Sequence, residues 1–233
     1  MRLTGGYNDS RLFLAGEKRN TYLYGRIKML NNSGFDLWAE GYDKSVGLSD
    51  EDGTYPFAGY RAILNAIYSR ILSASAKTVL DIGFGTATLT SKLYERGLMI
   101  YGQDFSEKML RIAREKMPKA ELYRGDFAKG LAEPLKRQKY DAIIATYSLH
   151  HLTNMQKAVF IGELLERLND GGCLYIGDVA FENREALEKC RQEAGSDWDE
   201  DEIYFVCEEI MEAFPGMHFE PMSHCAGLMT LKK

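Results

Sequence analysis

The sequence predicts an α/β fold in which a doubly wound, mixed sheet carries helices on both faces. Short apolar runs alternate with amphipathic helical stretches from residue 78 to residue 180, which is typical of parallel strands joined by crossover helices. Residues 78–90, T-V-L-D-I-G-F-G-T-A-T-L-T, indicate a buried strand, a tight glycine turn and the start of a helix. Several strands end in an acidic residue, at the edge of the sheet where such folds bind ligands.

The glycine turn indicates a nucleotide site whose ligand carries an amine instead of a diphosphate. Gly83 and Gly85 allow a sharp turn and the close approach of a ligand. The dinucleotide pattern G-x-G-x-x-G is incomplete, because Thr88 stands at the third glycine position. Asp81, at the end of the strand, would repel a diphosphate resting on the helix N-terminus. S-adenosylmethionine fits better, since its ammonium group can approach Asp81 and its carboxylate can approach free N–H groups near Ala87.

The segment D-I-G-F-G-T-A, residues 81–87, resembles motif I of the class I S-adenosylmethionine-dependent methyltransferases. Many members have a third glycine where this chain has Ala87. The resemblance covers about residues 35–233 and is strongest to small stand-alone bacterial enzymes of the YrrT-like type. It implies a Rossmann-like sheet of order 3-2-1-4-5-7-6 with strand 7 antiparallel. It also implies S-adenosylmethionine as the cofactor, S-adenosylhomocysteine as its product, and Phe84 and Thr86 in the cofactor site.

The composition is that of a globular chain without membrane spans. Its 233 residues are 45% hydrophobic, enough for a sizeable core, and its net charge of −5 argues against a protein that coats nucleic acid. The first residues lack an apolar stretch, so we expect neither a secretory signal nor a transmembrane helix. The four cysteines include no C-x-x-C pair, which indicates reduced thiols of a cytoplasmic protein and neither zinc ligands nor disulfides.

The first 34 residues are predicted to be an extension ahead of a domain over residues 35–233. Basic residues outnumber acidic ones in this extension and are interleaved with aromatic residues. Such a segment can be an arm that touches RNA or an acidic partner, or an amphipathic extension packed on the domain or on a second subunit. We favour the second interpretation, because the basic run is short and mixed. We therefore expect a monomer or a homodimer with no nucleic-acid partner.

Two helices are predicted ahead of the glycine turn. Trp38 and Tyr42 share a helical face, and the resemblance implies that their segment closes over the cofactor, with Tyr42 donating a hydrogen bond near the cofactor carboxylate. Alternatively, both residues are simply packed aromatics. Residues 55–72 read as a second helix that starts at the Pro56 signal.

Three later helices begin near a residue that can cap them. Thr86 or Thr88 is expected to cap the helix after the glycine turn. Ser106 and Thr153 are expected to cap the helices that follow the second and the fourth strand.

The second predicted strand, residues 98–104, ends in an acid that fits a ribose. Asp104 follows Gly85 by about 20 residues, the spacing of a carboxylate that binds a ribose diol in related folds. A carboxylate can accept hydrogen bonds from both hydroxyl groups at once. Asp104 could instead be a helix cap, although Ser106 is available for that role. We also assign Phe105, the next residue, to the cofactor site.

The third predicted strand, residues 120–124, leads to the tripeptide G-D-F. The resemblance implies an acid here against the adenine amino group, and Asp126 fits that role. Phe127 can add apolar cover to one side of the base. Taken alone, G-D-F is equally typical of a turn. Its position as the third acid at a strand end favours a functional role.

Residues 140–152, Y-D-A-I-I-A-T-Y-S-L-H-H-L, indicate the fourth strand and the loop after it. The resemblance implies that this loop lies beside the transferred methyl group, with Thr146 at the cofactor and Tyr147 at the reaction centre. His150 or His151 can remove a proton from the acceptor, because imidazole titrates near neutral pH. The alternative is that both histidines only pack. No third ligand is spaced near them, so no metal site is expected.

After a fifth strand over residues 173–179 the chain becomes acidic. We expect helices over residues 184–194 and 203–214, and interpret the charge as a solvated face or as a lid that favours cationic substrates. Two short final strands are expected to form the antiparallel end of the sheet, over residues 217–222 and 226–231.

The leading functional interpretation is a methyltransferase that acts on a small molecule. A sulfonium donor already activates the methyl group, so the protein mainly has to align donor and acceptor and exclude water. Two other classes stay open. One is a non-catalytic module that binds S-adenosylmethionine or S-adenosylhomocysteine. The other is an NAD-dependent oxidoreductase of the same fold, against which Asp81 and Thr88 both argue.

Overall fold

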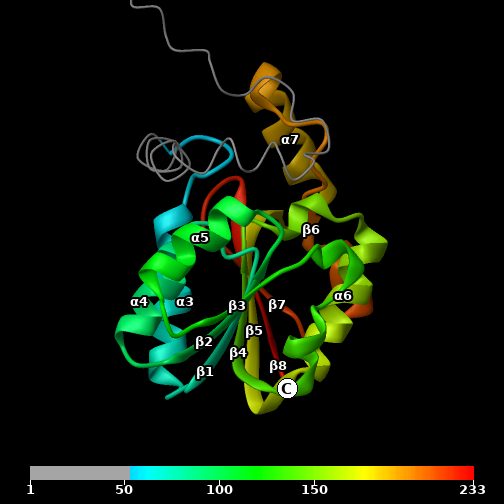
Figure 1. The fold of residues 1–233 in the computed structure, drawn as a ribbon. Coiled ribbons are helices and arrows are strands. Elements are labelled where there is room, and N and C mark those ends of the chain that lie inside the picture. Colours follow the sequence, from blue (N-terminus) through cyan, green and yellow to red (C-terminus); the bar gives the residue numbers. More distant parts are fainter. Residues whose placement is uncertain (1–52) are drawn as a thin grey trace, which may run out of the picture.

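One mixed sheet organises residues 53–233, the part of the chain that the computed structural model describes (Figure 1). The predicted boundary at residue 34 and the helix with Trp38 and Tyr42 lie outside these described residues. The strands are β1 (Thr78–Ile82), β2 (Met99–Asp104), β3 (Glu121–Arg124), β4 (Tyr140–Thr146), β5 (Leu168–Phe181), β6 (Phe205–Val206), β7 (His218–Pro221) and β8 (Ala226–Lys232). The helices are α3 (Tyr60–Ser73), α4 (Thr88–Glu95), α5 (Glu107–Lys116), α6 (Asn154–Glu166), α7 (Arg184–Ala194) and α8 (Cys207–Ala213).

The strand order is β3-β2-β1-β4-β5-β8-β7, and the first five strands are parallel. Strand β8 runs antiparallel to both β5 and β7. The two-residue strand β6 lies off this path and pairs only with the end of β5. With β6 set aside, the predicted order 3-2-1-4-5-7-6 with an antiparallel strand 7 is confirmed. The carboxyl ends of β1 to β5 therefore meet at one edge of the sheet.

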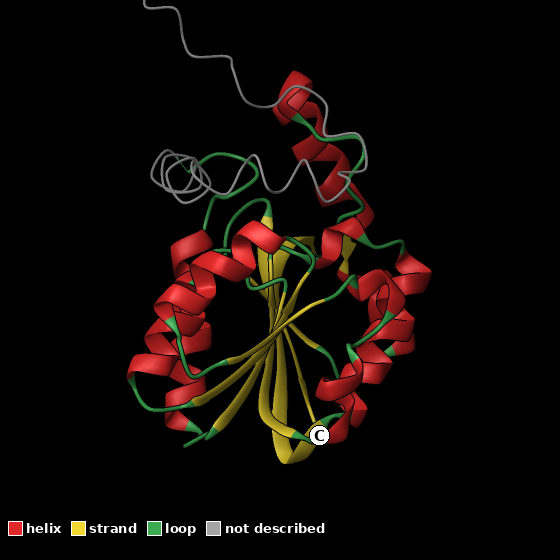
Figure 2. Ribbon diagram, in the orientation of Figure 1, coloured by secondary structure: helices red, strands yellow, loops and turns green. Residues whose placement is uncertain are grey.

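Helices cover both faces of the sheet, as the alternating pattern predicts (Figures 1 and 2). Helices α3, α4 and α5 bury their apolar sides against one face, in a core that also takes in Leu187 of α7. Helices α6 and α8 pack on the other face, around Phe160, Leu164 and Ile210. Among residues 53–233, the structure contains no helix long and apolar enough to cross a bilayer.

Two predicted helices have different bounds in the structure. The helix predicted over residues 55–72 starts only at Tyr60, because Gly59 precedes it with a φ of 84° and the residues before it form turns. The helix predicted over residues 203–214 is interrupted, since Phe205 and Val206 pair with the end of β5 and only α8 is helical. Pairing with a long neighbouring strand has overridden the local helical pattern there.

The predicted caps are confirmed in two of the three helices. The Ser106 side chain accepts from Met109 N, and Thr153 forms a capping box with Gln156. Neither Thr86 nor Thr88 caps α4. Its N-cap is Ala87, in a left-handed conformation (φ 59°) and with no side-chain cap, because the glycine turn itself sets the entry to that helix.

Candidate functional site

The glycine turn after β1 contains three left-handed residues, and the space beside them differs from one to the next. Gly83, Gly85 and Ala87 have φ values of 69°, 52° and 59°. A Cβ atom on Gly83 would lie 2.5 Å from the Cβ of Ser148, whereas a Cβ on Gly85 would meet nothing within 4 Å. Gly83 is therefore required for packing against the loop after β4, while the surroundings of Gly85 stay open to a ligand.

Asp81 is a buried acid with one unused oxygen. Its side chain is 2% exposed, and Oδ2 accepts a hydrogen bond from the Thr90 hydroxyl. Its Oδ1 atom is buried and accepts no hydrogen bond within the described part of the chain. Burial raises the pKa of Asp81 to about 7, and the nearby charge of Asp104 adds to this effect. A buried acceptor without a donor is costly, so the site favours a ligand that supplies an N–H group.

Asp104 connects the end of β2 to the glycine turn. The buried carboxylate accepts from Gly85 N through Oδ2 and from Ser106 N through Oδ1, both at 2.9 Å. It therefore positions the turn itself, a function that the sequence did not indicate. A carboxylate oxygen has two lone pairs and can accept more than one hydrogen bond, which is compatible with the predicted ribose contact.

Three further residues predicted for the cofactor site lie near the glycine turn and make packing contacts or backbone hydrogen bonds. Phe84 is buried in the core, and a Cβ on Gly102 would lie 2.7 Å from its ring, so Phe84 fills the space that Gly102 leaves. The Thr86 carbonyl accepts from Lys116 Nζ at 2.6 Å. The Phe105 carbonyl accepts from Arg124 Nε at 3.2 Å. Phe84 also lines the pocket beside the glycine turn, together with Gly83 and Gly85.

Asp126 and Phe127 follow β3 and differ in burial. Asp126 caps a short 3₁₀ helix through its bond from Ala128 N (3.0 Å), and its side chain is 47% exposed. Phe127 is buried, and its ring stacks on Phe160 with centroids 6.1 Å apart. Asp126 thus has the capping geometry of a turn residue, and its carboxylate remains accessible to solvent.

Thr146 and Tyr147 lie at the end of β4, next to the glycine turn. A pocket brings Thr146 together with Asp81, Gly85, Thr86 and Tyr60. Tyr60 was not predicted as a site residue. The signal that could have identified it is its position as the first residue of an amphipathic helix.

Tyr147 is a strained residue at the same edge. It adopts a φ of 50°, which is rare for a residue with a side chain. Its ring packs against the rings of Phe57 and Tyr60, at centroid distances of 5.3 and 5.2 Å. Strain of this kind concentrates at functional sites, where the surrounding structure maintains it.

His150 is held between two acids that the sequence did not connect to it. Its Nδ1 lies 2.6 Å from Asp178 Oδ1, and its Nε2 lies 3.4 Å from Glu202 Oε1. Burial by itself lowers the pKa of His150, but the charges of Asp178 and Glu202 outweigh burial and raise it to about 9. His150 is therefore an imidazolium at neutral pH and cannot accept a proton there.

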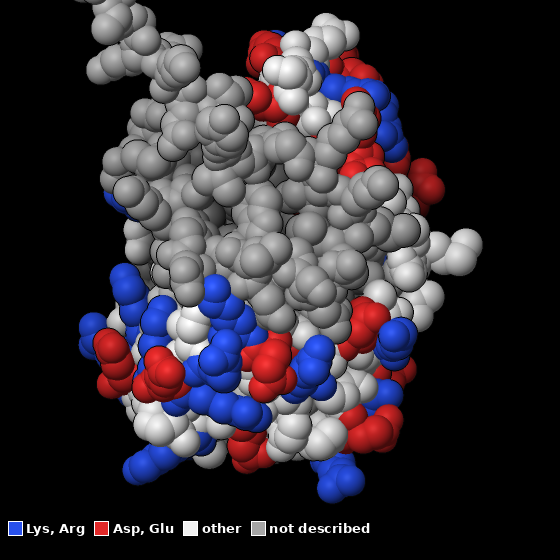
Figure 3. Space-filling model, turned by 45° about the horizontal axis from the view of Figure 1, so that its top comes forward, with Lys and Arg blue, Asp and Glu red and all other residues white. Residues whose placement is uncertain are grey.

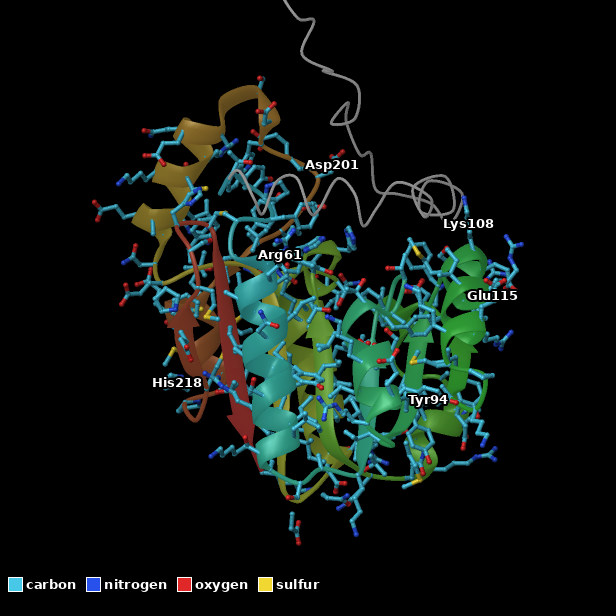
Figure 4. The ribbon with its side chains drawn as sticks, turned by 90° about the vertical axis from the view of Figure 1, so that its left-hand side faces the viewer. Arg61, Tyr94, Lys108, Glu115, Asp201 and His218 are labelled. Carbon is cyan, nitrogen blue, oxygen red and sulfur yellow. The ribbon has the colours of Figure 1, made fainter. Side chains whose placement is uncertain are left out.

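A chain of hydrogen bonds extends from Glu202 to the start of the described chain. The Tyr204 hydroxyl donates to Glu202 Oε2 at 2.9 Å and is also hydrogen-bonded to the Tyr55 hydroxyl. The Tyr55 ring stacks on Trp198, with centroids 5.1 Å apart. Residues 198–204 thus form a wall beside the histidines, at the same end of the molecule as Arg61 and Asp201 in Figure 4.

Buried Lys157 fixes this wall to α6. Its ammonium group donates to the Ile203 carbonyl and lies 4.4 Å from the centre of the Phe205 ring. The Ile203 N–H donates in turn to the His150 carbonyl at 2.8 Å. Burial lowers the pKa of Lys157 to about 8. The acidic segment after β5 is therefore held to the rest of the domain at Ile203, although most of its acidic side chains face solvent.

His151 differs from His150 in its protonation. Burial lowers its pKa well below 6.5, and the positive charge of His150 contributes to the shift. The two rings are in contact, with centroids 4.2 Å apart at 70°. Donor atoms of His150, His151 and Glu202 lie within 4.8 Å of one another, a group that can hold a proton or a cation. The pKa of His150 indicates a proton at neutral pH, and His151 is the neutral imidazole.

The family model and the sequence relatives both identify a methyltransferase. Residues 79–172 match the model of a family described as a methyltransferase domain. An uncharacterized methyltransferase of Anoxybacillus flavithermus is 39% identical over 160 residues, which cover 69% of this chain and 72% of that protein. An uncharacterized methyltransferase of Alkaliphilus oremlandii is 33% identical over 190 residues, covering 78% and 86%.

Solved structures share the fold at low sequence identity. Magnesium protoporphyrin IX methyltransferase from Synechocystis, with bound S-adenosylhomocysteine, has a TM-score of 0.62 at 17% identity, covering 87% of this chain and 100% of that one. An S-adenosylmethionine-dependent methyltransferase from Clostridium acetobutylicum has a TM-score of 0.63 at 15% identity, covering 82% and 98%. The predicted Rossmann-like sheet is thus confirmed by architecture as well as by strand order.

Proposed function

Because this chain belongs to the class I S-adenosylmethionine-dependent methyltransferases, we propose that it transfers the methyl group of that cofactor to a small-molecule acceptor bound beside β4 and β5. The cofactor is S-adenosylmethionine, as the family requires, and the product is S-adenosylhomocysteine. The family leaves the acceptor open. Our proposal for the acceptor side rests on the residues after β4 and on the wall formed by residues 198–204.

One observation supports the cofactor assignment above all others, namely the unused oxygen of Asp81. A buried carboxylate oxygen without a donor fits the ammonium group of the methionine part. The open space beside Gly85 accommodates the ligand next to the start of α4, where the positive end of the helix dipole favours its carboxylate. Asp104 and Asp126 then lie along the same edge for the ribose and the adenine.

We assign the two histidines different roles. His151 is neutral at physiological pH, so it can take a proton from an acceptor that must lose one. His150 is fixed as an imidazolium by Asp178 and Glu202, so it acts as a positioning residue for the loop that carries His151. The sequence alone left either histidine as a possible general base, and this proposal assigns that role to His151.

Tyr147 and its aromatic neighbours are proposed to exclude water from the reaction. A sulfonium donor needs alignment and dehydration more than it needs activation. The rings of Phe57, Tyr60 and Tyr147 pack together at the edge of the pocket that contains Thr146 and Asp81. They are placed to line the space between cofactor and acceptor.

The two alternative functions receive no support from the comparisons. An NAD-dependent oxidoreductase would place a diphosphate near Asp81, where a carboxylate repels it. A non-catalytic binding module would not require a neutral histidine on the loop after β4.

Titration calorimetry and a turnover panel test the proposal together. The protein should bind S-adenosylmethionine and S-adenosylhomocysteine and should not bind NAD. Incubation with methyl-labelled cofactor and a panel of amines, phenols, carboxylic acids and thiols should transfer label to one acceptor class. Binding of the cofactor without transfer to any member of a wide panel would favour the binding module.

A further inference from the structure

A cluster of two cysteines and a histidine lies apart from the proposed site. Cys190, on α7, is 3% exposed, and Cys225, directly before β8, is fully buried. His224 stands next to Cys225 in the turn between β7 and β8, and it is exposed. The two sulfur atoms and an imidazole nitrogen all lie within 4.8 Å of one another. None of the three residues has a role in the proposed reaction.

We propose that Cys190, His224 and Cys225 bind a Zn²⁺ ion. Two thiolates and an imidazole are typical zinc ligands, and sulfur ligands disfavour Mg²⁺ and Ca²⁺. Tetrahedral Zn–S bonds of about 2.3 Å place two sulfurs about 3.8 Å apart, so the donor atoms need to move by only about 1 Å. Both thiols release their protons to solvent when the ion binds. A water molecule can complete the tetrahedron on the side of the exposed His224.

The turn that presents two of the ligands is held by several hydrogen bonds. The Ser223 hydroxyl accepts from Cys225 N (3.2 Å) and Ala226 N (3.0 Å), and it donates to the Ala58 carbonyl at 2.7 Å. Met222 N also donates to the Ala226 carbonyl at 2.9 Å. His224 and Cys225 are therefore held in place by their own turn, and only α7 has to bring Cys190 to them.

Sequence spacing gave no signal for this site. Cys190 and Cys225 are far apart in the chain, so the cysteines lack the paired spacing of common zinc sites and no zinc was expected. The sheet brings them together, because α7 follows β5 and the turn at Cys225 leads into β8, the neighbour of β5. All four cysteines are free thiols in the structure, so none is committed to a disulfide.

The ion would join α7 to the hairpin of β7 and β8. Helix α7 leads into residues 198–204, whose Trp198, Glu202 and Tyr204 form the wall beside His150. A bound ion should therefore stabilise this wall and leave the glycine turn unchanged. This effect on turnover rests on the proposed function, whereas the metal site itself does not.

Metal content and cobalt spectroscopy test the site directly. Untagged protein purified without chelators should contain about one zinc per chain. Metal-free protein titrated with Co²⁺ should develop a thiolate-to-cobalt charge-transfer band that saturates at one equivalent, together with the visible bands of tetrahedral cobalt. Zn²⁺ should displace the cobalt and raise the midpoint of thermal unfolding.

Matched variants separate the cluster from general thiol binding. Cys190→Ser, Cys225→Ser and His224→Ala should lose the band. Cys173→Ser, Cys207→Ser and His218→Ala should keep it; the first two replace buried free thiols, and His218 lies low on the hairpin in Figure 4. His224 is exposed, so His224→Ala should fold even if a buried cysteine variant does not.

Three results would overturn the proposal. The first is metal-free protein that shows no charge-transfer band with excess Co²⁺. The second is a band that the control variants lose as readily as the cluster variants. The third is a Cys190–Cys225 disulfide, found by mass spectrometry of protein isolated under non-reducing conditions. Cofactor binding is measured in parallel, and its failure would affect only the proposed function.

Discussion

The carboxyl edge of the sheet has two halves that are built in different ways. In the half formed by β1 and β2, the bonds stay within the strand–turn–helix region, since Asp104 accepts from Gly85 N and Ser106 N and Asp81 accepts from the Thr90 hydroxyl. In the half formed by β4 and β5, side chains distant in sequence hold one another, as in the contacts of His150 with Asp178 and Glu202. We infer that the first half binds the cofactor and the second half binds the acceptor, as proposed above.

The largest effect is expected in the acceptor half, from His151→Gln. Turnover should fall by about 10² to 10⁴, because the neutral base is lost, while the Kd for S-adenosylmethionine should stay within about twofold. Single-turnover kinetics and calorimetry measure the two quantities. Equal losses in both would break the separation between the halves. An unchanged rate would mean that alignment and dehydration carry the reaction without a base.

Asp81→Asn tests the half formed by β1 and β2 through cofactor affinity. The cofactor Kd should rise by about 10- to 100-fold, because a charge-assisted bond to the ammonium is lost. In the wild type, affinity should increase as pH rises through about 7, where Asp81 loses its proton. Calorimetry between pH 5.5 and 8.5, a range chosen as about 1.5 units around that pKa, measures both trends. A Kd independent of both pH and the substitution would exclude the ammonium contact.

The same substitution should stabilise the cofactor-free fold. The folded-state pKa of Asp81 lies above its ordinary value of 3.8, so the folded protein holds a proton that the unfolded chain has lost. Stability is therefore lost as pH rises from about 4 through about 7. Asp81→Asn removes this loss, and urea unfolding at pH 8 should show a gain of about 1–3 kcal/mol.

His150→Gln tests the acceptor half through stability. The folded-state pKa of His150 is raised to about 9, so its two ion pairs contribute fully below pH 6.5 and are lost as pH rises through 9. Wild-type stability should fall by about 1–3 kcal/mol over that window, and the variant should lack this fall. His151→Gln serves as the control. It removes an imidazole that is neutral over this pH window, so the fall in stability should persist in that variant. A wild-type unfolding free energy that stays flat from pH 6 to 9.5 would contradict the ion pairs.

The smallest effect is expected from Asp126→Ala. Its carboxylate is 47% exposed and caps a single 3₁₀ turn, so cofactor affinity and stability should each change by less than about 1 kcal/mol. Asp104→Ala is the matched comparison at a buried position and should cost about 1–3 kcal/mol of cofactor affinity. A larger loss at Asp126 than at Asp104 would reverse the ranking of the two acids.

The sequence predicted the cofactor half better than the acceptor half for a physical reason. Asp81, Gly83 and Gly85 lie within one strand–turn–helix motif, so local spacing already fixes their neighbourhood. Asp178 and Glu202 reach His150 only through the pairing of β5 with β4 and β6, which no local pattern encodes. The contact of Phe84 with Gly102 was not predicted, because residue type does not reveal which face a turn presents.

The charged residues of the surface differ from the charged residues of the site in their burial. Lys and Arg side chains are mixed with Asp and Glu on the described part of the face in Figure 3. Three acids of the site, Asp81, Asp104 and Asp178, are instead buried on β1, β2 and β5. Counting charges along the sequence could not separate these two populations.

If the cofactor ammonium pairs with the unused oxygen of Asp81, as we propose, cofactor binding releases protons. With a pKa of about 7, about half of the cofactor-free molecules carry the proton at neutral pH, and the arriving ammonium group expels it. The heat of binding then includes the ionisation heat of the buffer, so buffers of different ionisation enthalpy should give different apparent enthalpies at one pH. The buffer dependence gives the number of protons released per cofactor bound, which should be about one half at pH 7.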